Sequence, residues 1–208
     1  MKLKVCGMRS SKNIISLAKI MPDYMGFIFW ENSKRFVSNS TPDLGEAVKK
    51  VGVFVNASLD HIKDCIKAHK LKAIQLHGNE SPEQCSELGD VDVEVIKAFA
   101  VQKEFDFSEI DAYESVCDYF LFDTKGELPG GNGHHFDWTL LKDYPSKKPF
   151  FLSGGIGPND YVAIASIIKL NLPLYAIDVN SKFEIEPGFK NIKSIKEFKS
   201  KLRNEIPG

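Results

Sequence analysis

The chain has 208 residues, of which 43% are hydrophobic and 26% are charged. Its 27 Lys and Arg residues nearly balance 28 Asp and Glu residues, which gives a formal net charge of −1. This composition is typical of a globular protein and excludes disordered, collagen-like and mucin-like chains. The balanced charge also argues against an electrostatic nucleic-acid binder, because such proteins usually carry a basic face.

The sequence predicts a cytoplasmic protein. It has no run of about 18 apolar residues, so no membrane span is expected. The first predicted strand begins at Leu3, which leaves no room for a signal peptide before it. In a reducing compartment the four cysteines are expected to be free thiols, and their wide spacing matches no zinc motif.

Short runs rich in Val, Ile, Phe and Tyr alternate with longer amphipathic runs. Almost continuously apolar runs of this kind are typical of parallel strands that are covered on both faces. Eight strands are predicted: Leu3–Cys6, Met25–Phe29, Gly52–Val55, Ala73–Leu76, Glu94–Ala98, Tyr119–Phe122, Phe150–Leu152 and Tyr175–Val179.

Amphipathic patterns predict helices between several of these strands. The helices are expected to begin at Ser11, to cover Asp60–His69 after Ser58, to open at Ser81-Pro82, and to cover Pro158–Leu170 and Ile192–Leu202. Ser81 is a suitable N-cap, and Pro82 fits the first helical position. The lysine-rich stretch from Lys190 to Arg203 is interpreted as the solvated face of the last helix.

Eight strand-and-helix units are typical of a (β/α)8 barrel, the TIM-barrel fold. No Pro- or Ser-rich linker interrupts the pattern, so residues 1–208 are expected to form a single domain. The alternative is an open doubly wound sheet, which usually has fewer strands. A nucleotide-binding sheet of that kind would carry G-x-G-x-x-G after its first strand, where this chain has Cys6-Gly7-Met8-Arg9.

Active sites of such barrels lie at the C-terminal ends of the strands. Polar and glycine residues gather at these ends: Cys6, Ser33-Lys34-Arg35, His77-Gly78-Asn79-Glu80, Asp123-Thr124-Lys125, Ser153-Gly154-Gly155, and Asp178 with Asn180 and Ser181. The strand bodies behind them are apolar. A purely structural barrel has no need of this asymmetry.

Gly154 and Gly155 indicate a phosphate site, because barrels often bind phosphate in the loops after strands seven and eight. A tight turn without a ligand is the alternative. Asn180 and Ser181 would add donors at the start of a short extra helix.

Cys6 and Asp123 are expected to face each other across the barrel mouth. A carboxyl group on a buried strand is costly unless it is paired or used. A thiol and a carboxyl on opposite sides of a phosphate-anchored substrate suggest acid–base chemistry on a sugar phosphate. By itself, Cys6 also fits a small buried core residue.

Three further motifs carry less chemistry. Residues Pro129 to Gly133 are glycine-rich but lack the Lys-Ser/Thr of a P-loop, so they are interpreted as a mobile loop over the mouth. His134 and His135 are adjacent, and such side chains point to opposite sides of an extended chain, so no metal site is expected. Ser153 lacks the G-x-S-x-G context of a hydrolase nucleophile.

Taken together, these motifs make the chain resemble the phosphoribosylanthranilate isomerase family. The matching segments are Lys4-Val5-Cys6-Gly7-Met8, Gly26-Phe27-Ile28-Phe29, Ser33-Lys34-Arg35, Val53-Phe54-Val55-Asn56, Gln75-Leu76-His77-Gly78-Asn79-Glu80, Asp123-Thr124-Lys125, Gly130-Gly131-Asn132-Gly133, Phe136-Asp137-Trp138, Leu152-Ser153-Gly154-Gly155, Asp178 through Glu184, and Pro187-Gly188. Each motif alone is weak, but together they run in the right order along nearly the whole chain.

The resemblance implies the Amadori rearrangement of N-(5-phosphoribosyl)anthranilate to the 1-amino-1-deoxyribulose 5-phosphate in tryptophan biosynthesis. It implies that Asp123 is the general acid and Cys6 the general base. It further implies that Arg35 holds the anthranilate carboxylate, that Asp178 lies near the reacting sugar, and that Gly154, Gly155, Asn180 and Ser181 surround the phosphate. No metal or organic cofactor is implied, and the barrel is expected to be a monomer or a homodimer.

The chain departs from the family pattern at three places. Lys34 stands where the family usually has proline, Asn132 where it has threonine or serine, and Lys182 where it has glycine. A left-handed backbone at Lys182 would be strained by about a kcal/mol or more. Alternatively, its ammonium could reach the phosphate.

Two other functions remain possible from the sequence. One is the histidine-pathway isomerase that performs the same rearrangement, which would be expected to carry Asp at the position of Cys6. The other is a catalytically silent barrel that binds a phosphate ligand or a protein partner; the presence of both Cys6 and Asp123 argues against it.

Overall fold

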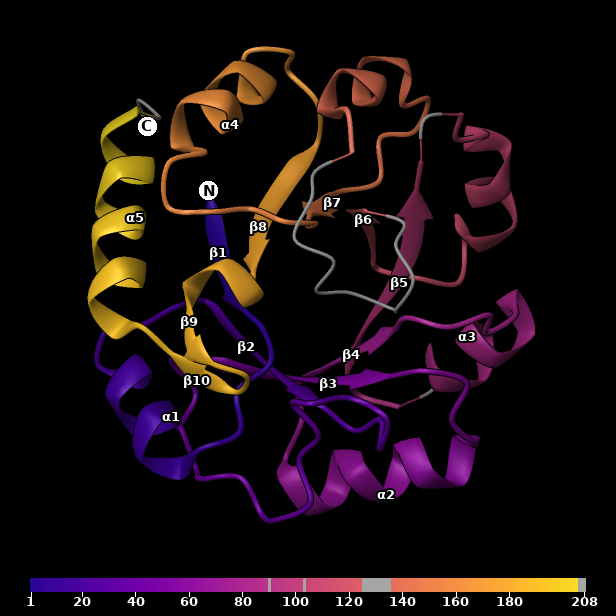
Figure 1. The fold of residues 1–208 in the computed structure, drawn as a ribbon. Helices are drawn as coiled ribbons and strands as arrows, with labels where there is room; N and C mark the ends of the chain where they lie inside the picture. The colour runs from indigo at the N-terminus through magenta and orange to yellow at the C-terminus, as the bar shows by residue number, and fades with distance from the viewer. Residues whose placement is uncertain (90, 103, 125–135, 206–208) are drawn as a thin grey trace.

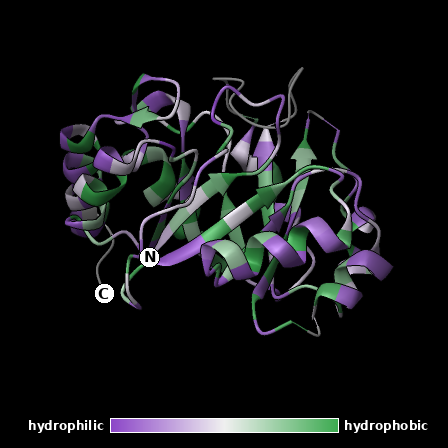
Figure 2. Ribbon diagram, turned by 90° about the horizontal axis from the view of Figure 1, so that it is seen from below, coloured by the Kyte–Doolittle hydropathy of each residue, from purple (hydrophilic) through white to green (hydrophobic). Residues whose placement is uncertain are grey.

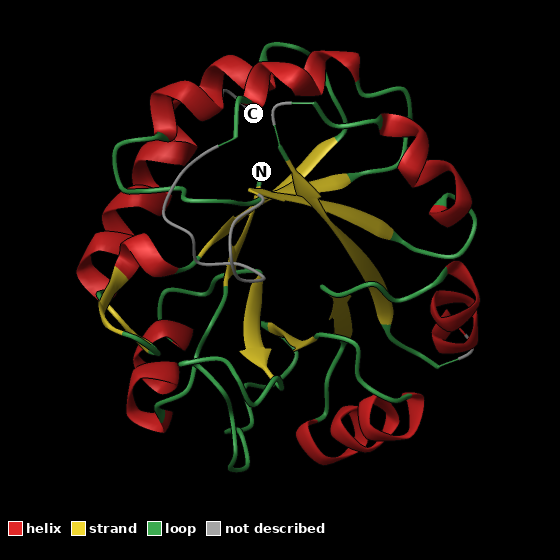
Figure 3. Cartoon of the chain, turned by 45° about the vertical axis from the view of Figure 1, so that its right-hand side comes forward, coloured by secondary structure: helices red, strands yellow, loops and turns green. Residues whose placement is uncertain are grey.

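The computed structural model describes residues 1–89, 91–102, 104–124 and 136–205. Eight parallel strands follow one another in chain order, and the sheet closes because β1 pairs with both β2 and β8. Helices and loops form a ring around these strands (Figure 1, Figure 3). The predicted (β/α)8 barrel is confirmed, and the open-sheet alternative is excluded.

The barrel strands agree with the predicted ones to within a few residues. They are β1 (Lys2–Val5), β2 (Tyr24–Ile28), β3 (Lys49–Phe54), β4 (Ala73–Leu76), β5 (Glu94–Val101), β6 (Tyr119–Thr124), β7 (Phe150–Leu152) and β8 (Leu174–Val179). A short antiparallel pair, β9 (Glu184–Glu186) and β10 (Phe189–Lys190), follows the barrel and was not anticipated.

The helices that cover the barrel differ in length. They are α1 (Ser11–Ala18), α2 (Leu59–His69), α3 (Pro82–Gly89), α4 (Tyr161–Ile168) and α5 (Ile192–Glu205), with 3-10 helices η1 (Phe107–Tyr113), η2 (Trp138–Asp143) and η3 (Ser181–Phe183). The predicted start of α3 is confirmed: Ser81 Oγ accepts from the Gln84 amide at 3.4 Å, and Gln84 Oε1 accepts from the Ser81 amide at 2.9 Å. This reciprocal pair is a capping box.

One helix prediction is corrected. The helix expected from Pro158 begins only at Tyr161, because Asp160 closes a turn by accepting from the Gly157 amide at 2.6 Å. The second strand–helix unit has no helix, since residues 29–48 are loop. That segment is rich in Ser, Asn, Thr, Pro and Gly, which favour turns over helices.

Apolar side chains fill two regions. The larger core lies between the strands and the surrounding helices. Figure 2 shows the strands coloured mainly as hydrophobic and the helices as mixed. The smaller core lies inside the barrel and contains Tyr24, Val51, Ala73, Ile96, Ala98, Leu121, Phe151 and Ala176. Every second side chain of a strand points inward. Gln75, Asp123 and Asp178, each two residues after a member of this inner core, therefore also point inward and form the next layer toward the C-terminal ends of the strands.

Lys190 corrects the interpretation of the lysine-rich segment. Within α5 that interpretation holds, because Ile195, Phe198 and Leu202 are buried while Lys193 and Lys196 are exposed. Lys190, however, lies in β10 and is completely buried. The helix begins two residues later, so the helical periodicity that exposes the other lysines does not extend to it.

The four cysteines are buried and unpaired by disulfides. In the part of the chain that the structure describes, no helix combines the length and the apolar character that crossing a membrane requires.

Candidate active site

A cavity opens at the C-terminal end of the barrel. Its strand-derived walls are Cys6, Ile28, Val53, Val55, Gln75, His77, Asp123, Ser153 and Asp178, and its loop-derived walls are Trp30, Ser33, Gly154, Gly155, Ile156, Asn180 and Ser181. The cavity therefore gathers every predicted site residue except Arg35. Neighbours in this cavity come from strands that are far apart in sequence, which the closed barrel brings together.

Cys6 follows β1 and lies 5% exposed at the wall of the cavity. Its amide donates to Val179 O at 2.9 Å, which fixes the end of β1 against β8. On the other side, a Cβ added at Gly26 would lie 2.6 Å from Cys6 Sγ, so only glycine fits there. Burial raises the pKa of the Cys6 thiol, and the nearby ammonium groups of Lys4 and Lys190 partly oppose that rise.

Lys4 and Asp178 form an ion pair inside the barrel. The strand register places them side by side, and Lys4 Nζ lies 2.7 Å from Asp178 Oδ2. Burial raises the pKa of Asp178, and the Lys4 ammonium opposes this. Asp178 Oδ1 is buried and has no hydrogen-bond partner among the described residues. Because Asp178 lines the cavity, that oxygen is suited to accept a hydrogen bond from a ligand hydroxyl.

A hydrogen-bonded chain continues from Lys4 across the barrel to Asp123. Lys4 Nζ donates to Gln75 Oε1 at 2.7 Å, and Gln75 Nε2 lies 2.7 Å from His77 Nδ1. An ammonium can only donate, so the Gln75 oxygen faces Lys4 and its NH2 group faces His77. His77 Nδ1 then accepts, which leaves the ring proton on Nε2, 3.3 Å from Asp123 Oδ2. The chain thereby orients His77 as a donor toward Asp123.

Asp123 and Gly154 are fitted closely to each other. Asp123 is 4% exposed, and its Oδ1 accepts from the Thr124 amide at 2.8 Å. Gly154 has φ +93°, and a Cβ there would lie 2.2 Å from Thr124 Oγ1 and 3.0 Å from Asp123 Oδ1. The turn after β7 therefore needs glycine both for its backbone conformation and for its approach to β6.

Arg35 does not itself line the cavity, but Ser33, two residues before it, does. The Arg35 guanidinium makes a bidentate ion pair with Glu184, with Nε–Oε1 2.9 Å and Nη2–Oε2 2.7 Å. Its aliphatic stem packs on Gly7, where a Cβ would come within 2.6 Å of Arg35 Cδ. Arg35 thus stands next to the turn that follows Cys6.

Lys182 shows no backbone strain. It lies in η3, and it is not among the described residues with positive φ. The strain expected for a left-handed lysine at the family's glycine position is therefore absent.

Three polar residues of the site were not assigned a role from the sequence: Lys4, Gln75 and His77. Their signal was present, since Lys4 stands two residues before Cys6 and Gln75 two before His77. A charged or amide side chain in an apolar strand points to the barrel interior when it stands two residues before a residue that lies at the barrel mouth, because alternate side chains share one face of the strand.

Some predictions fall on residues that the structure does not describe. They concern Lys125, the glycine-rich loop over residues 129–133, and the His134-His135 pair. These remain predictions from the sequence.

The fold and the polar cavity define a (β/α)8-barrel enzyme with a candidate acid–base site at the mouth. The family model of "N-(5'phosphoribosyl)anthranilate (PRA) isomerase" matches residues 3–201. The chain belongs to this family and is an isomerase of tryptophan biosynthesis.

Individual relatives agree with this placement. The N-(5'-phosphoribosyl)anthranilate isomerase of Parabacteroides distasonis is 45% identical over 95% of this chain and 91% of its own. The crystal structure of the Thermotoga maritima enzyme is 32% identical with TM-score 0.83, covering 98% of this chain and 99% of its own. A further structure of such an isomerase, 29% identical with TM-score 0.79 over 98% and 99% of the two chains, is a complex with reduced 1-(o-carboxyphenylamino)-1-deoxyribulose 5-phosphate.

Proposed function

We propose that Cys6 and Asp123 are the general base and the general acid by which this chain converts N-(5'-phosphoribosyl)anthranilate to 1-(2-carboxyphenylamino)-1-deoxyribulose 5-phosphate. The observation that carries the proposal is that both side chains line one cavity at the C-terminal end of the barrel. The family membership supports the choice of substrate.

The reaction begins with one proton donated and one removed. Asp123 gives its proton to the ribose ring oxygen while the C1–O bond breaks, and the nitrogen lone pair forms an iminium at C1. The Cys6 thiolate then takes the proton from C2, which the iminium has made acidic. The resulting enolamine takes up a proton at C1 and loses the proton of its C2 hydroxyl, which gives the ketose. Every proton is returned over the cycle, and no cofactor enters it.

The remaining predicted site residues are assigned to binding. Phosphate is held by Gly154, Gly155, Asn180 and Ser181, whose glycines allow backbone amides to approach an anion. Asp178 Oδ1, which has no hydrogen-bond partner among the described residues, accepts from a sugar hydroxyl. Arg35 holds the anthranilate carboxylate, because guanidinium groups recognise carboxylates through paired N–H donors.

Three further properties complete the proposal. Residues 1–208 act as one barrel domain, and the chain is a monomer or a homodimer. The cytoplasm is the proposed compartment, supported by four cysteines that are not in disulfides.

The test follows the fluorescence of freshly prepared N-(5'-phosphoribosyl)anthranilate with the purified wild type, Cys6→Ala and Asp123→Asn. Wild type should consume the substrate, and each variant should lose about 10²- to 10⁴-fold in turnover, the usual contribution of a positioned acid or base. Binding of the reduced product analogue and thermal unfolding should change little in the variants.

Two control variants separate chemistry from folding. Cys65→Ala removes an equally buried thiol from α2, and Asp118→Asn alters a carboxylate that accepts from the Val95 amide. Both should retain turnover. Wild-type inactivity in a folded sample would contradict the activity and favour a silent barrel, whereas unimpaired turnover in either site variant would refute that residue's role.

A further inference from the structure

We propose that Glu184 and Lys190 are positioning residues that hold Arg35 so that one edge of its guanidinium faces the carboxylate of the substrate. They would make the enzyme select aryl amines that carry an acidic group. The inference rests on the proposed function, since Arg35 is the carboxylate-binding residue only there.

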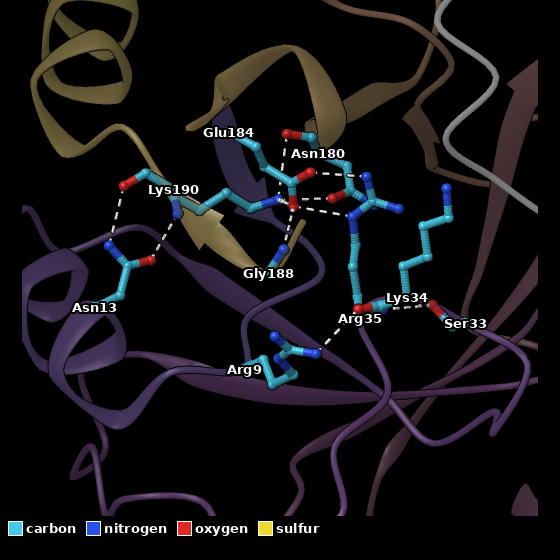
Figure 4. A network of polar contacts seen from close by, with 9 residues as sticks. All are labelled: Arg9, Asn13, Ser33, Lys34, Arg35, Asn180, Glu184, Gly188 and Lys190. Atoms are coloured by element: carbon cyan, nitrogen blue, oxygen red, sulfur yellow. Dashed lines mark hydrogen bonds and ion pairs between the residues drawn. The ribbon is translucent and has the colours of Figure 1, made fainter. Parts of the chain in front are cut away.

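Glu184 is the centre of this network, which Figure 4 shows. Its side chain is 5% exposed, and its Oε1 accepts from Arg35 Nε, Gly188 N and Lys190 Nζ at 2.9, 3.0 and 2.7 Å. Its Oε2 accepts from Arg35 Nη2 at 2.7 Å. Burial alone would raise the pKa of Glu184, but the hydrogen bonds from Arg35 and Lys190 outweigh this and lower it. Glu184 is therefore a fixed anion rather than a solvated surface charge.

Lys190 links Glu184 to the wall of the cavity through hydrogen bonds. Its ammonium also donates to Asn180 Oδ1 at 2.6 Å, and Asn180 lines the cavity. The backbone of Lys190 is fixed in turn, because Asn13 on α1 accepts from its amide at 2.7 Å and donates to its carbonyl at 2.9 Å. A completely buried lysine with hydrogen bonds to three residues, Asn13, Asn180 and Glu184, leaves Glu184 little freedom to move.

The geometry at Arg35 leaves one edge for a ligand. A guanidinium carries five N–H donors in a planar fork, and its two broad edges can each bind one carboxylate. Glu184 takes the Nε–Nη2 edge. In Figure 4, Nη1 points away from Glu184, so the edge formed by Nη1 and Nη2 is not covered by Glu184.

The charges also favour an anionic ligand. Arg35 and Lys190 are both bound to the single anion Glu184, so this buried group has one excess positive charge. A ligand carboxylate on the second edge would balance it. A neutral aryl group would leave the excess uncompensated in a poorly hydrated place, which is costly.

The experiment measures two ligands with two variants. The ligands are the reduced product analogue, 1-(2-carboxyphenylamino)-1-deoxyribulose 5-phosphate in reduced form, and the same molecule with phenyl in place of carboxyphenyl. The variants are Glu184→Gln and the double variant Glu184→Gln/Lys190→Met, which removes both charges and so avoids stranding a buried ammonium. Glu186→Gln, an exposed glutamate on the same strand β9, is the matched control.

Both variants should bind the carboxylated analogue about tenfold or more weakly, the loss expected when a charge-assisted contact is misplaced. Their affinity for the phenyl analogue should stay within about twofold of wild type, and KM for the substrate should rise more than kcat falls. Glu186→Gln should match wild type for both ligands.

An equal loss for the two analogues, or no loss for either, would overturn the positioning role. The positioning role would also be overturned if the double variant unfolded at a lower temperature but kept the wild-type preference for the carboxylated analogue. Failure of the proposed function is a separate result, because it would appear as a wild type that neither turns over the substrate nor prefers the carboxylated analogue.

Discussion

Lys4 on β1 and Asp178 on β8 are neighbours in strand register and share a 2.7 Å ion pair inside the barrel, although 174 residues separate them in sequence. The pair closes the seam between the first and last strands. Lys4 also stands two residues before Cys6, which follows the same strand. This one buried cation therefore both helps to close the barrel and opposes the rise in the pKa of the candidate base.

Replacement of Lys4 by methionine should destabilise the protein by about 3–5 kcal/mol, because it leaves the Asp178 carboxylate buried without its partner. Chemical denaturation would measure the loss. Adding Asp178→Asn should recover most of the stability, since the stranded charge is then gone. Lys2→Met is the control: Lys2 pairs with Asp23 at the surface with its side chain 49% exposed, and such pairs contribute little. Equal effects of the two lysine variants would contradict the prediction.

The pH profile should reflect the buried thiol. Burial raises the pKa of Cys6 above the ordinary thiol value. A base must be unprotonated, so in Asp123→Asn, where the acid no longer titrates, the residual kcat/KM is expected to rise with pH above neutrality, by at most about tenfold per pH unit, and to level off above the thiol pKa. Residual turnover of Cys6→Ala should not show this rise. An Asp123→Asn profile that is flat between pH 7 and 9 would rule out Cys6 as the titrating base.

Gly154→Ala should reduce both stability and turnover. The new Cβ would collide with Thr124 at 2.2 Å in a backbone with φ +93°, a combination that costs about 1–3 kcal/mol. The displaced Thr124 would also move Asp123, so kcat should fall in the folded fraction. Gly157→Ala is the matched control, because its Cβ would meet no atom closer than 3.5 Å. The two variants are compared by thermal unfolding and by turnover at a temperature where both are folded, and similar values would disprove the steric argument.

Lys190 should make stability depend on pH in the alkaline range. Burial lowers the pKa of Lys190 to about 8, even though Glu184 opposes the shift. The unfolded value is about 10.4, so between these pH values the unfolded chain binds more protons and the folded state gains stability as pH rises. The gain is at most about 3 kcal/mol.

The measurement compares denaturation free energies at pH 7 and pH 10 for wild type and Lys190→Met. Other groups titrate in the same range, but they are common to both proteins. Wild type should therefore gain stability relative to the variant on going from pH 7 to pH 10. Parallel pH dependences would show that Lys190 keeps its proton in the folded protein.

Much of the fold could be predicted because its signals are local. Runs of apolar residues define the strands, and Ser81 with Pro82 defines the start of α3. The late start of α4 was missed, because it depends on the Asp160–Gly157 contact, a turn that competes with helix formation.

The site could be predicted in part for a similar reason. Residues at strand ends share one mouth whenever parallel strands close into a barrel, so Cys6, Asp123, Asp178 and the glycine pair were found from position alone. The ion pair of Arg35 could not be predicted in this way. Its partner Glu184 belongs to the hairpin β9–β10, and no periodic pattern in the sequence indicates that hairpin.

By itself, the sequence determined the strand order, the class of barrel and the polar residues at its mouth, since these depend on period, spacing and residue type along one chain. Only the tertiary structure decided which of the many lysines became buried cations. Lys190 looks like a surface residue in the linear sequence, and the partner of Lys4 cannot be read from it, but barrel closure and the hairpin place each lysine beside a carboxylate. Charges are stable in such places only when a partner is brought within hydrogen-bond distance, and that distance depends on segments up to 174 residues apart.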